Sequence, residues 1–109
     1  MANLTAEKRG KKKAGAAEFC GVKQTADEVV FTIYCPNASV VQLAGSFNNW
    51  QPQEMKATTK KDYRQAKLVL EPGRYAYRFV VDGKWQQDYC NSNTEHNPYG
   101  EVNSVVVVS

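Results

Sequence analysis

Apolar and polar positions alternate with a period of two along much of the chain after residue 28, which is typical of β-strands with one buried face. The clearest case is the segment 75–81, in which every odd position carries a large apolar side chain. Arg78 occupies an even position of this segment and is therefore expected to point away from the core. The aromatic side chains that we assign to the core are Phe47, Tyr75, Tyr77 and Phe79.

Further strands are expected where β-branched or aromatic residues gather between turn signals. They cover residues 29–34, 40–44, 67–70, 84–86 and 102–108. Asp82-Gly83 predicts a type I′ hairpin, and the polar segment from Asp88 to Gly100 is expected to be a loop. Because no window of about 10–15 residues has a helical period, the pattern predicts an all-β, immunoglobulin-like antiparallel β-sandwich over residues 19–109.

The 109 residues suffice for one domain, and the net charge of +3 is unevenly distributed along them. Residues 1–18 hold five Lys or Arg and two Glu, whereas residues 19–109 hold nine residues of each sign. We therefore predict a disordered, Lys-rich tail over residues 1–18, which either solubilises the protein or tethers it to nucleic acid or an acidic surface. No apolar run is long enough for a membrane span or a signal peptide, so we expect a cytoplasmic protein without membrane contact.

The three cysteines, Cys20, Cys35 and Cys90, are odd in number and have no Cys-x-x-Cys spacing. This pattern argues against a disulfide framework and against a zinc site. We therefore expect free thiols in a reducing compartment, and neither a metal nor a cofactor.

Trp50 and Trp85 each follow a turn signal, the first at the end of Gly-Ser-Phe-Asn-Asn-Trp and the second after Asp82-Gly83. Turns lie at the surface and a buried indole needs a partner for its N–H, so both tryptophans are surface candidates. Flat exposed aromatic rings suit the apolar C–H faces of sugars. The sequence therefore favours a carbohydrate-binding module, with the alternative that one or both tryptophans fill the core.

Two polar side chains are expected near Trp85. Arg78 lies across the predicted hairpin from Trp85, and Asn103 joins them if the last strand runs beside that hairpin. Arginine offers five N–H donors and asparagine both donors and an acceptor, so each can bridge neighbouring sugar hydroxyls. In the alternative reading, Arg78 is an ordinary surface charge and Asn103 closes a turn or caps a strand.

Three motifs resemble carbohydrate-binding module family forty-eight, in uninterrupted order within residues 28–109. They cover residues 45–50, 72–85 and 97–108. That family includes the glycogen-binding domain of the AMP-activated protein kinase beta subunit and the N-terminal modules of isoamylases and glycogen branching enzymes. The resemblance implies an early-set β-sandwich that binds glycogen, starch-like glucans and cyclodextrins without catalysis.

The resemblance also implies the residues that bind the glucan. Trp50 and Trp85 match the aromatic residues that stack on glucose rings. Arg78 takes the place of a lysine that bonds glucose hydroxyls, which keeps the charge but changes its shape. Asn103 matches the sugar-bonding asparagine of the last strand.

The loop before the last strand departs further from the family. Tyr99 matches a leucine that inserts into or packs on the glucan, and a tyrosine there can stack instead. Glu101 matches a threonine that bonds the glucan. Asp88-Tyr89-Cys90 replaces the usual Asp-Pro turn, which leaves the course of the following loop open.

Other functions fit the sequence less well. His96 is the only histidine, and Asp82 and Asp88 form a conceivable glycosidase pair, but Asp82 is expected to shape its turn, so we expect no enzyme. The same fold also serves as a protein-docking or scaffold module of a kinase or an amylase-type enzyme, which would cover the tryptophan face with protein. Nucleic-acid binding is disfavoured because the sandwich is neutral. The expected partners are an α-glucan, such as glycogen or a malto-oligosaccharide, and a glycogen-metabolising enzyme or kinase.

Overall fold

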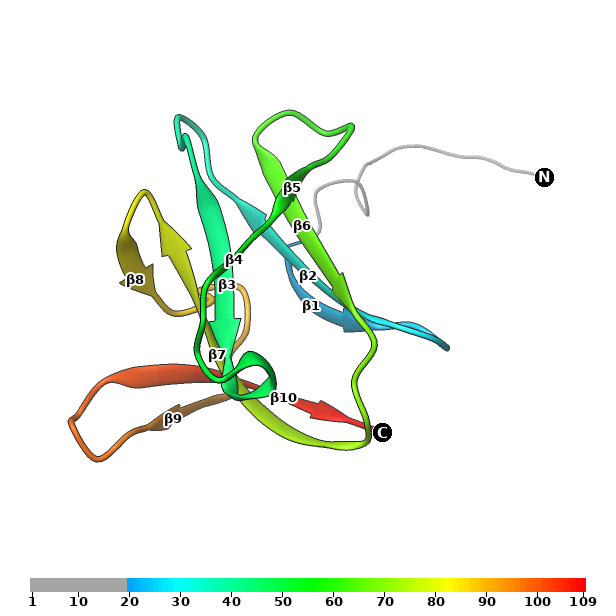
Figure 1. The fold of residues 1–109 in the computed structure, drawn as a ribbon, viewed down its shortest axis with the longest axis vertical. Helices are drawn as coiled ribbons and strands as arrows, with labels where there is room; N and C mark the ends of the chain where they lie inside the picture. Colours follow the sequence, from blue (N-terminus) through cyan, green and yellow to red (C-terminus); the bar gives the residue numbers. More distant parts are fainter. Residues whose placement is uncertain (1–19) are drawn as a thin grey trace.

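The computed structural model describes residues 20–109, which form two antiparallel β-sheets packed against each other (Figure 1). This arrangement confirms the predicted all-β, immunoglobulin-like sandwich. The predicted tail over residues 1–18 and the boundary of the domain lie outside the described residues. Within the described part, no helix is long and apolar enough to cross a bilayer.

The smaller sheet has four strands in the order β1-β2-β6-β5. Their bounds are Gly21–Gln24 for β1, Val29–Tyr34 for β2, Tyr63–Leu68 for β6 and Lys56–Ala57 for β5. β2 confirms the predicted segment 29–34. β6 begins four residues before the predicted segment 67–70 and ends within it, because its polar first half is held by its ladder with β2.

The larger sheet has six strands in the order β4-β3-β7-β10-β9, with β8 paired to the second half of β7. Their bounds are Gln53–Glu54 for β4, Val41–Gly45 for β3, Gly73–Val81 for β7, Val102–Val108 for β10, Thr94–His96 for β9 and Lys84–Gln86 for β8. The long strand β7 thus forms the centre of this sheet, and it carries the clearest alternation of the sequence.

The expectation of an uninterrupted loop from Asp88 to Gly100 is wrong. Thr94–His96 form β9, which pairs with β10 and places His96 opposite Val102. The three residues of β9 have no apolar alternation, so backbone pairing with β10 makes them a strand rather than their own propensity. The short strands β1, β4 and β5 also escaped the sequence analysis, for the same reason.

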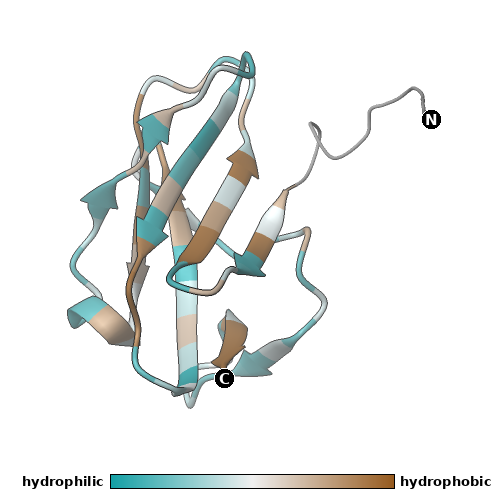
Figure 2. Cartoon of the chain, turned by 90° about the vertical axis from the view of Figure 1, so that its right-hand side faces the viewer, coloured by the Kyte–Doolittle hydropathy of each residue, from teal (hydrophilic) through white to brown (hydrophobic). Residues whose placement is uncertain are grey.

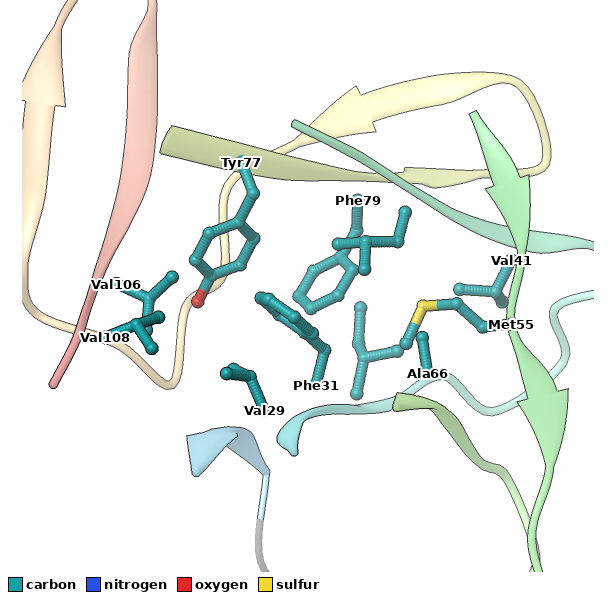
Figure 3. Packing of buried hydrophobic residues seen from close by; sticks show 11 residues of the cluster. Val29, Phe31, Val41, Met55, Ala66, Tyr77, Phe79, Val106 and Val108 are labelled. Carbon is teal, nitrogen blue, oxygen red and sulfur yellow. The ribbon is translucent and has the colours of Figure 1, made fainter. Parts of the chain in front are cut away.

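The core lies between the two sheets and is centred on aromatic side chains (Figure 3). Phe31 of β2 meets Tyr77 of β7 edge to face, with their ring centroids 4.9 Å apart, and Tyr77 in turn meets Phe79 at 5.8 Å. Phe47 and Tyr75 are partly buried and pack against this cluster. The four aromatic residues assigned to the core from the sequence are therefore confirmed there.

The expectation of three free thiols is wrong for two of them. Cys20 and Cys90 form a disulfide with their Cα atoms 5.8 Å apart, while Cys35 has a free thiol. The two cysteines are 70 positions apart, so their spacing carries no sign of the bridge. They meet because the start of β1 passes close to Cys90, as the approach of Gly21 to the carbonyl oxygen of Cys90 shows.

Candidate functional site

The pairing of β7 leaves one residue between two partner strands. β3 pairs with β7 along one edge, whereas β10 and β8 share the other edge. The ladder with β10 ends at Tyr77 and the pairing with β8 begins at Phe79, so Arg78 lies at the point where the two partners diverge. Tyr77 and Phe79 point into the core, and alternation therefore turns Arg78 to the outer face of the sheet.

The hairpin of β7 and β8 places Trp85 on this same outer face. Trp85 pairs with Val80, and cross-strand partners point to the same side of a sheet, as do Val80 and Arg78 along β7. Positive φ angles at Asp82 and Gly83 fit the predicted type I′ turn. Trp85 is 44% exposed, and the guanidinium carbon of Arg78 lies 5.5 Å from the centre of its ring system.

A tight turn after β3 brings Trp50 to the other side of Arg78. Asn49 and Trp50 both have left-handed backbone conformations, and the Trp50 N–H donates to the carbonyl oxygen of Gly45 at 2.9 Å. The side-chain oxygen of Asn48 accepts from the Gly45 N–H at 3.0 Å and fixes the start of the turn. Trp50 is half-buried, with the guanidinium carbon of Arg78 5.9 Å from its ring centre.

Position 45 in this turn requires glycine, because the neighbouring atoms leave no room for a side chain. A Cβ atom at this position would lie 2.6 Å from the carbonyl oxygen of Ala76 and equally close to the ring of Phe47. The Gly-Ser-Phe-Asn-Asn-Trp motif thus lets the chain pack closely against β7 and places Trp50 beside Arg78.

Hydrogen bonds hold Arg78 from the side of β10. Its Nε atom donates to Oδ1 of Asn103 at 3.0 Å, and Nη2 donates to Oε1 of Glu101 at 3.1 Å. The Arg78 side chain is only 16% exposed. Arg78 therefore joins the two tryptophans with Glu101 and Asn103, which brings together five of the six residues predicted from the sequence.

Asn103 is 5% exposed, and its amide is engaged on both sides within the protein. Its Nδ2 atom donates to Oε2 of Glu95 at 3.4 Å, while Oδ1 accepts from Arg78. Glu95 also pairs with Arg74 at 2.7 Å, and hydrogen bonds from Arg74 and then Asn103 lower the pKa of its carboxyl group. The sequence analysis missed Glu95 and Arg74, because their placement depends on the unpredicted strand β9.

The turn between β9 and β10 is organised by Asn97. Its Oδ1 atom accepts from the backbone N–H groups of Tyr99 and Glu101, both at 2.9 Å, and its Nδ2 donates to Oε1 of Glu101 at 3.0 Å. The side-chain bond from Asn97 is the largest cause that lowers the pKa of the Glu101 carboxyl group, followed by the bond from Arg78. Asn97 was not predicted, although Asn-Pro at 97–98 is a turn signal that could have identified it.

Tyr99 lies at the tip of this turn and is 88% exposed. Its ring has no aromatic or cation–π contact among the described residues. The structure thus presents a solvent-facing aromatic ring at the edge of the site, joined to its centre through Glu101.

A buried network supports the site from below. The Tyr77 hydroxyl donates to Oδ2 of Asp88 at 2.7 Å and accepts from Nδ2 of Asn91 at 3.0 Å, and the Asp88 N–H donates to Oγ of Ser104 at 2.7 Å. Burial is the largest cause that raises the pKa values of both Asp88 and Tyr77. Because Tyr77 precedes Arg78 and Ser104 follows Asn103, the network holds both strands beneath the site.

The two aspartates considered as a glycosidase pair have other partners. Asp88 is buried in the network just described. The Asp82 carboxylate accepts hydrogen bonds from the backbone N–H groups of Ser39 and Val40, at 3.0 and 2.8 Å, and so ties the hairpin to the start of β3. Among residues 20–109, no group of His, Cys, Asp and Glu side chains is arranged to hold a metal ion.

The candidate site combines aromatic rings with a fixed positive charge. Two indole rings flank a guanidinium whose position is fixed by an amide and a carboxylate. Such a surface offers apolar planes for contact and charged or polar groups for hydrogen bonding within a few ångströms of each other.

Known proteins resemble this chain over much of its length. The protein FLOURY ENDOSPERM 6, chloroplastic, from Oryza sativa subsp. japonica is 32% identical over 80 residues, which cover 73% of this chain and 15% of that protein. The protein PTST homolog 2, chloroplastic, from Arabidopsis thaliana is 40% identical over 58 residues, or 52% of this chain and 11% of that protein. The 5'-AMP-activated protein kinase subunit beta-1 of Sus scrofa is 35% identical over 68 residues, or 62% of this chain and 53% of that protein.

The chain therefore spans between about a tenth and about half of these relatives. A solved structure of a putative alpha amylase from Salmonella typhimurium shares the fold, with a TM-score of 0.64 at 23% identity over 81% of this chain and 14% of that one. The family described as the glycogen recognition site of AMP-activated protein kinase matches residues 29–109. The chain belongs to that family, as its motifs predicted.

Proposed function

We propose that the face formed by Trp50, Arg78 and Trp85 binds α-1,4-linked glucans, such as glycogen, starch-like oligosaccharides and cyclodextrins, without catalysis. The observation that carries this proposal is the position of Arg78 between the two indole rings, 5.9 and 5.5 Å from their centres. Family membership supports the same ligand class.

The indole rings supply apolar planes for the C–H faces of glucose units. Trp85 is the more exposed of the two and is the main stacking surface, while Trp50 is half-buried and flanks the guanidinium. Tyr99 at the tip of the neighbouring turn adds a third ring that can contact a longer chain. Because a shallow site with few anchors loses much contact energy to ordering, we expect dissociation constants of about 10 μM to 1 mM.

Arg78 supplies the hydrogen bonds at the centre of the site. Two of its five N–H groups are used by Asn103 and Glu101, which leaves three donors for sugar hydroxyls. Glu101 is more than half exposed and can accept from a hydroxyl through its second oxygen. Asn103 is nearly covered, so its role in this proposal is to position Arg78 rather than to contact the sugar.

Partner enzymes are part of the proposal. Relatives of this chain include kinase regulatory subunits and a phosphoglucan phosphatase, of which it matches a part. We propose that a module of this kind brings a glucan-modifying enzyme or a kinase to its polysaccharide. Asp82 and Asp88, which hold the hairpin and the core, and the exposed His96 give no support to a catalytic role of the module itself.

Calorimetric titration with maltoheptaose and β-cyclodextrin tests the proposal. We expect binding by the wild-type chain and at least about tenfold weaker binding by Trp85→Ala, because a stacking ring is removed. Tyr34→Ala is the matched control, since Tyr34 is an exposed aromatic residue on the opposite sheet. Absence of binding by a folded wild-type chain contradicts the proposal, and equal weakening by Tyr34→Ala contradicts the assigned face.

A further inference from the structure

The lysines of the smaller sheet gather on its outer face, opposite the tryptophans. One row of cross-strand partners on β1, β2 and β6 consists of Lys23, Val30 and Lys67. The next row, on β2, β6 and β5, consists of Thr32, Gln65 and Lys56. All three lysines are exposed, and no acidic residue occupies either row. Figure 2 views the chain from this side and shows teal, hydrophilic bands along β6 beside the mostly brown β2.

This face is hollowed. A depression of about 400 Å³ is lined by Lys23, Lys60 and Lys67 together with four threonines and Gln65. A second depression of about 770 Å³ shares Thr58, Thr59, Gln65 and Lys67 with the first. It continues past Lys56 to β4 at the edge of the sandwich. We call the two together the lysine furrow. Its one acidic lining residue is Glu54, at the end towards β4.

Three of the lysines that line the furrow keep their charge uncompensated within residues 20–109. Lys23, Lys56 and Lys67 make no ion pair with any described carboxylate. The ion pairs of the larger sheet, by contrast, tie Arg74 to Glu95 and Arg78 to Glu101. The nine cations and nine anions of residues 19–109 therefore sum to zero without cancelling locally, and one face is basic.

The furrow has the chemistry of a site for phosphate groups on a sugar chain. A lysine ammonium is a compact charge with three donors and binds phosphate well. Threonine hydroxyls both donate and accept, as sugar hydroxyls require. At the floor, Gln65 donates to the buried hydroxyl of Thr32 at 3.2 Å, and this bond fixes the amide that faces the ligand.

We propose that the lysine furrow binds phosphate esters carried by an α-glucan chain, as a second site on the face opposite the tryptophans. This inference rests on the proposed function, because it assumes that the ligand is a glucan. The furrow is lined from β1, β2, β6 and β5 and ends at β4, and a site of this extent suits a chain better than a single anion.

Two other anionic partners fit the lining less well. Single-stranded nucleic acids bind to platforms of several aromatic rings, whereas Tyr63 is the one aromatic residue that lines the furrow. Protein interfaces are anchored by buried Trp, Tyr or Arg side chains in apolar pockets, whereas lysine, threonine and glutamine dominate here. A second site for the same polymer also raises the apparent affinity for a particle with many chains.

The test compares one glucan with and without phosphate. The probes are a maltodextrin fraction carrying glucose 6-phosphate groups and the same fraction after phosphatase treatment, titrated calorimetrically into the full chain. We expect the phosphorylated fraction to bind about 5–10 times more tightly at low salt, since each surface lysine contributes modestly. This preference should largely vanish at about 0.5 M salt, because screening weakens exposed charge interactions.

Variants separate the two faces. Lys23→Gln with Lys67→Gln should remove most of the preference for phosphate and leave binding of the dephosphorylated fraction unchanged. Lys61→Gln, which removes an exposed lysine outside the furrow, should retain the preference. Trp85→Ala should weaken binding of both fractions by the same factor. The unfolding temperature of each variant shows whether it is folded.

Different results would contradict the furrow proposal and the proposed function. Equal affinity for the two fractions overturns the furrow proposal and leaves the tryptophan site standing. No binding of the dephosphorylated fraction, together with tight binding of the phosphorylated one, overturns the proposed function instead. If polyglutamate or a single-stranded oligonucleotide of equal charge binds the furrow as tightly as the phosphorylated fraction, the site recognises charge alone and the glucan assignment is wrong.

Discussion

The Nε atom of Arg78 donates a hydrogen bond to Oδ1 of Asn103 at 3.0 Å, just beyond the last pair of the ladder between β7 and β10. Ser104 pairs with Tyr77, so Asn103 stands opposite Arg78 where the two strands separate. Because Asn103 is 5% exposed, it acts beneath the surface and directs the guanidinium between the two tryptophans.

Asn103→Ala should therefore weaken glucan binding even though Asn103 has little surface to offer a ligand. The substitution removes the acceptor that holds Nε of Arg78, and we expect about tenfold weaker binding of maltoheptaose and about 1–2 kcal/mol lower stability. Calorimetric titration and chemical denaturation measure the two effects.

A double-mutant cycle separates positioning from direct contact. Arg78→Lys keeps the charge but cannot bond Asn103 and Glu101 with a planar fork. If Asn103 acts through Arg78, the losses in binding free energy from Arg78→Lys and Asn103→Ala are smaller together than their sum. Additive losses would show that Asn103 contacts the sugar independently.

Gly45→Ala should disturb the turn that carries Trp50. The added Cβ would meet the backbone oxygen of Ala76 at 2.6 Å, and this oxygen belongs to the central strand β7 and cannot move freely. The φ angle of Gly45 is −167°, which any residue adopts, so the cost comes from crowding alone. We expect a loss of about 1–3 kcal/mol of stability together with weaker glucan binding.

Gly83→Ala provides the comparison for this prediction. A Cβ on Gly83 meets nothing within 4 Å, but its φ angle of +85° disfavours any side chain. We expect a loss of about 1 kcal/mol from backbone strain. Thermal and urea unfolding measure the stability of both variants. If Gly45→Ala is as stable as the wild type, the backbone of β7 shifts to accommodate the new methyl group and the prediction is wrong.

The long strands and most of the site could be predicted because their signals are local. Alternation along 75–81 identified the core face of β7 and turned Arg78 outward, and Asp82-Gly83 predicted the hairpin that places Trp85. The position of Asn103 was predicted only on the condition that the last strand runs beside this hairpin. The pairing of β10 with β7 fulfils this condition.

The parts that escaped prediction depend on contacts between distant segments. β9 is a strand because it pairs with β10, so Glu95 and its bonds to Arg74 and Asn103 could not be foreseen from three polar residues. The Cys20–Cys90 bridge joins positions with no informative spacing. The basic furrow arises from strand order, which places Lys23, Lys56 and Lys67 on one face although the sandwich is neutral.

Removal of the disulfide by Cys20→Ser with Cys90→Ser should lower stability and spare the glucan site. The bridge closes a segment of 70 residues, and we expect a loss of about 2–4 kcal/mol in urea unfolding. Binding of maltoheptaose should change less than about twofold, since the Asn91 side chain still bonds Tyr77 and the carbonyl oxygen of Val105.

Reductant supplies the control for this prediction. It should destabilise the wild-type chain to the level of the double serine variant and leave that variant unaffected. Because a disulfide persists in oxidising surroundings, the bridge removes the support that the cysteines gave to a cytoplasmic location, which stays a prediction. A wild-type chain whose stability ignores reductant would contradict the pairing of Cys20 with Cys90.

Asp88 gives the chain a distinctive dependence of stability on pH. Its buried carboxyl group has a pKa above the ordinary value of 3.8, mainly because burial disfavours the charged form, while bonds from Tyr77 and Cys90 oppose the shift. The folded protein thus keeps this proton to a higher pH than the unfolded chain does. The contribution of Asp88 to stability is therefore fully present below 3.8 and decreases as the pH rises through the raised pKa.

Asp88→Asn isolates this effect, because the other carboxyl groups, including Glu95 and Glu101 with their lowered pKa values, titrate in both proteins. An asparagine can still accept a hydrogen bond from Tyr77 and stays neutral. We expect the free energy of unfolding of the wild type to fall relative to that of Asp88→Asn as the pH rises from about 3.5 to 7. Urea unfolding at intervals over this range measures the difference. A difference that stays constant over the range would show that Asp88 titrates in the folded protein as it does in the unfolded chain.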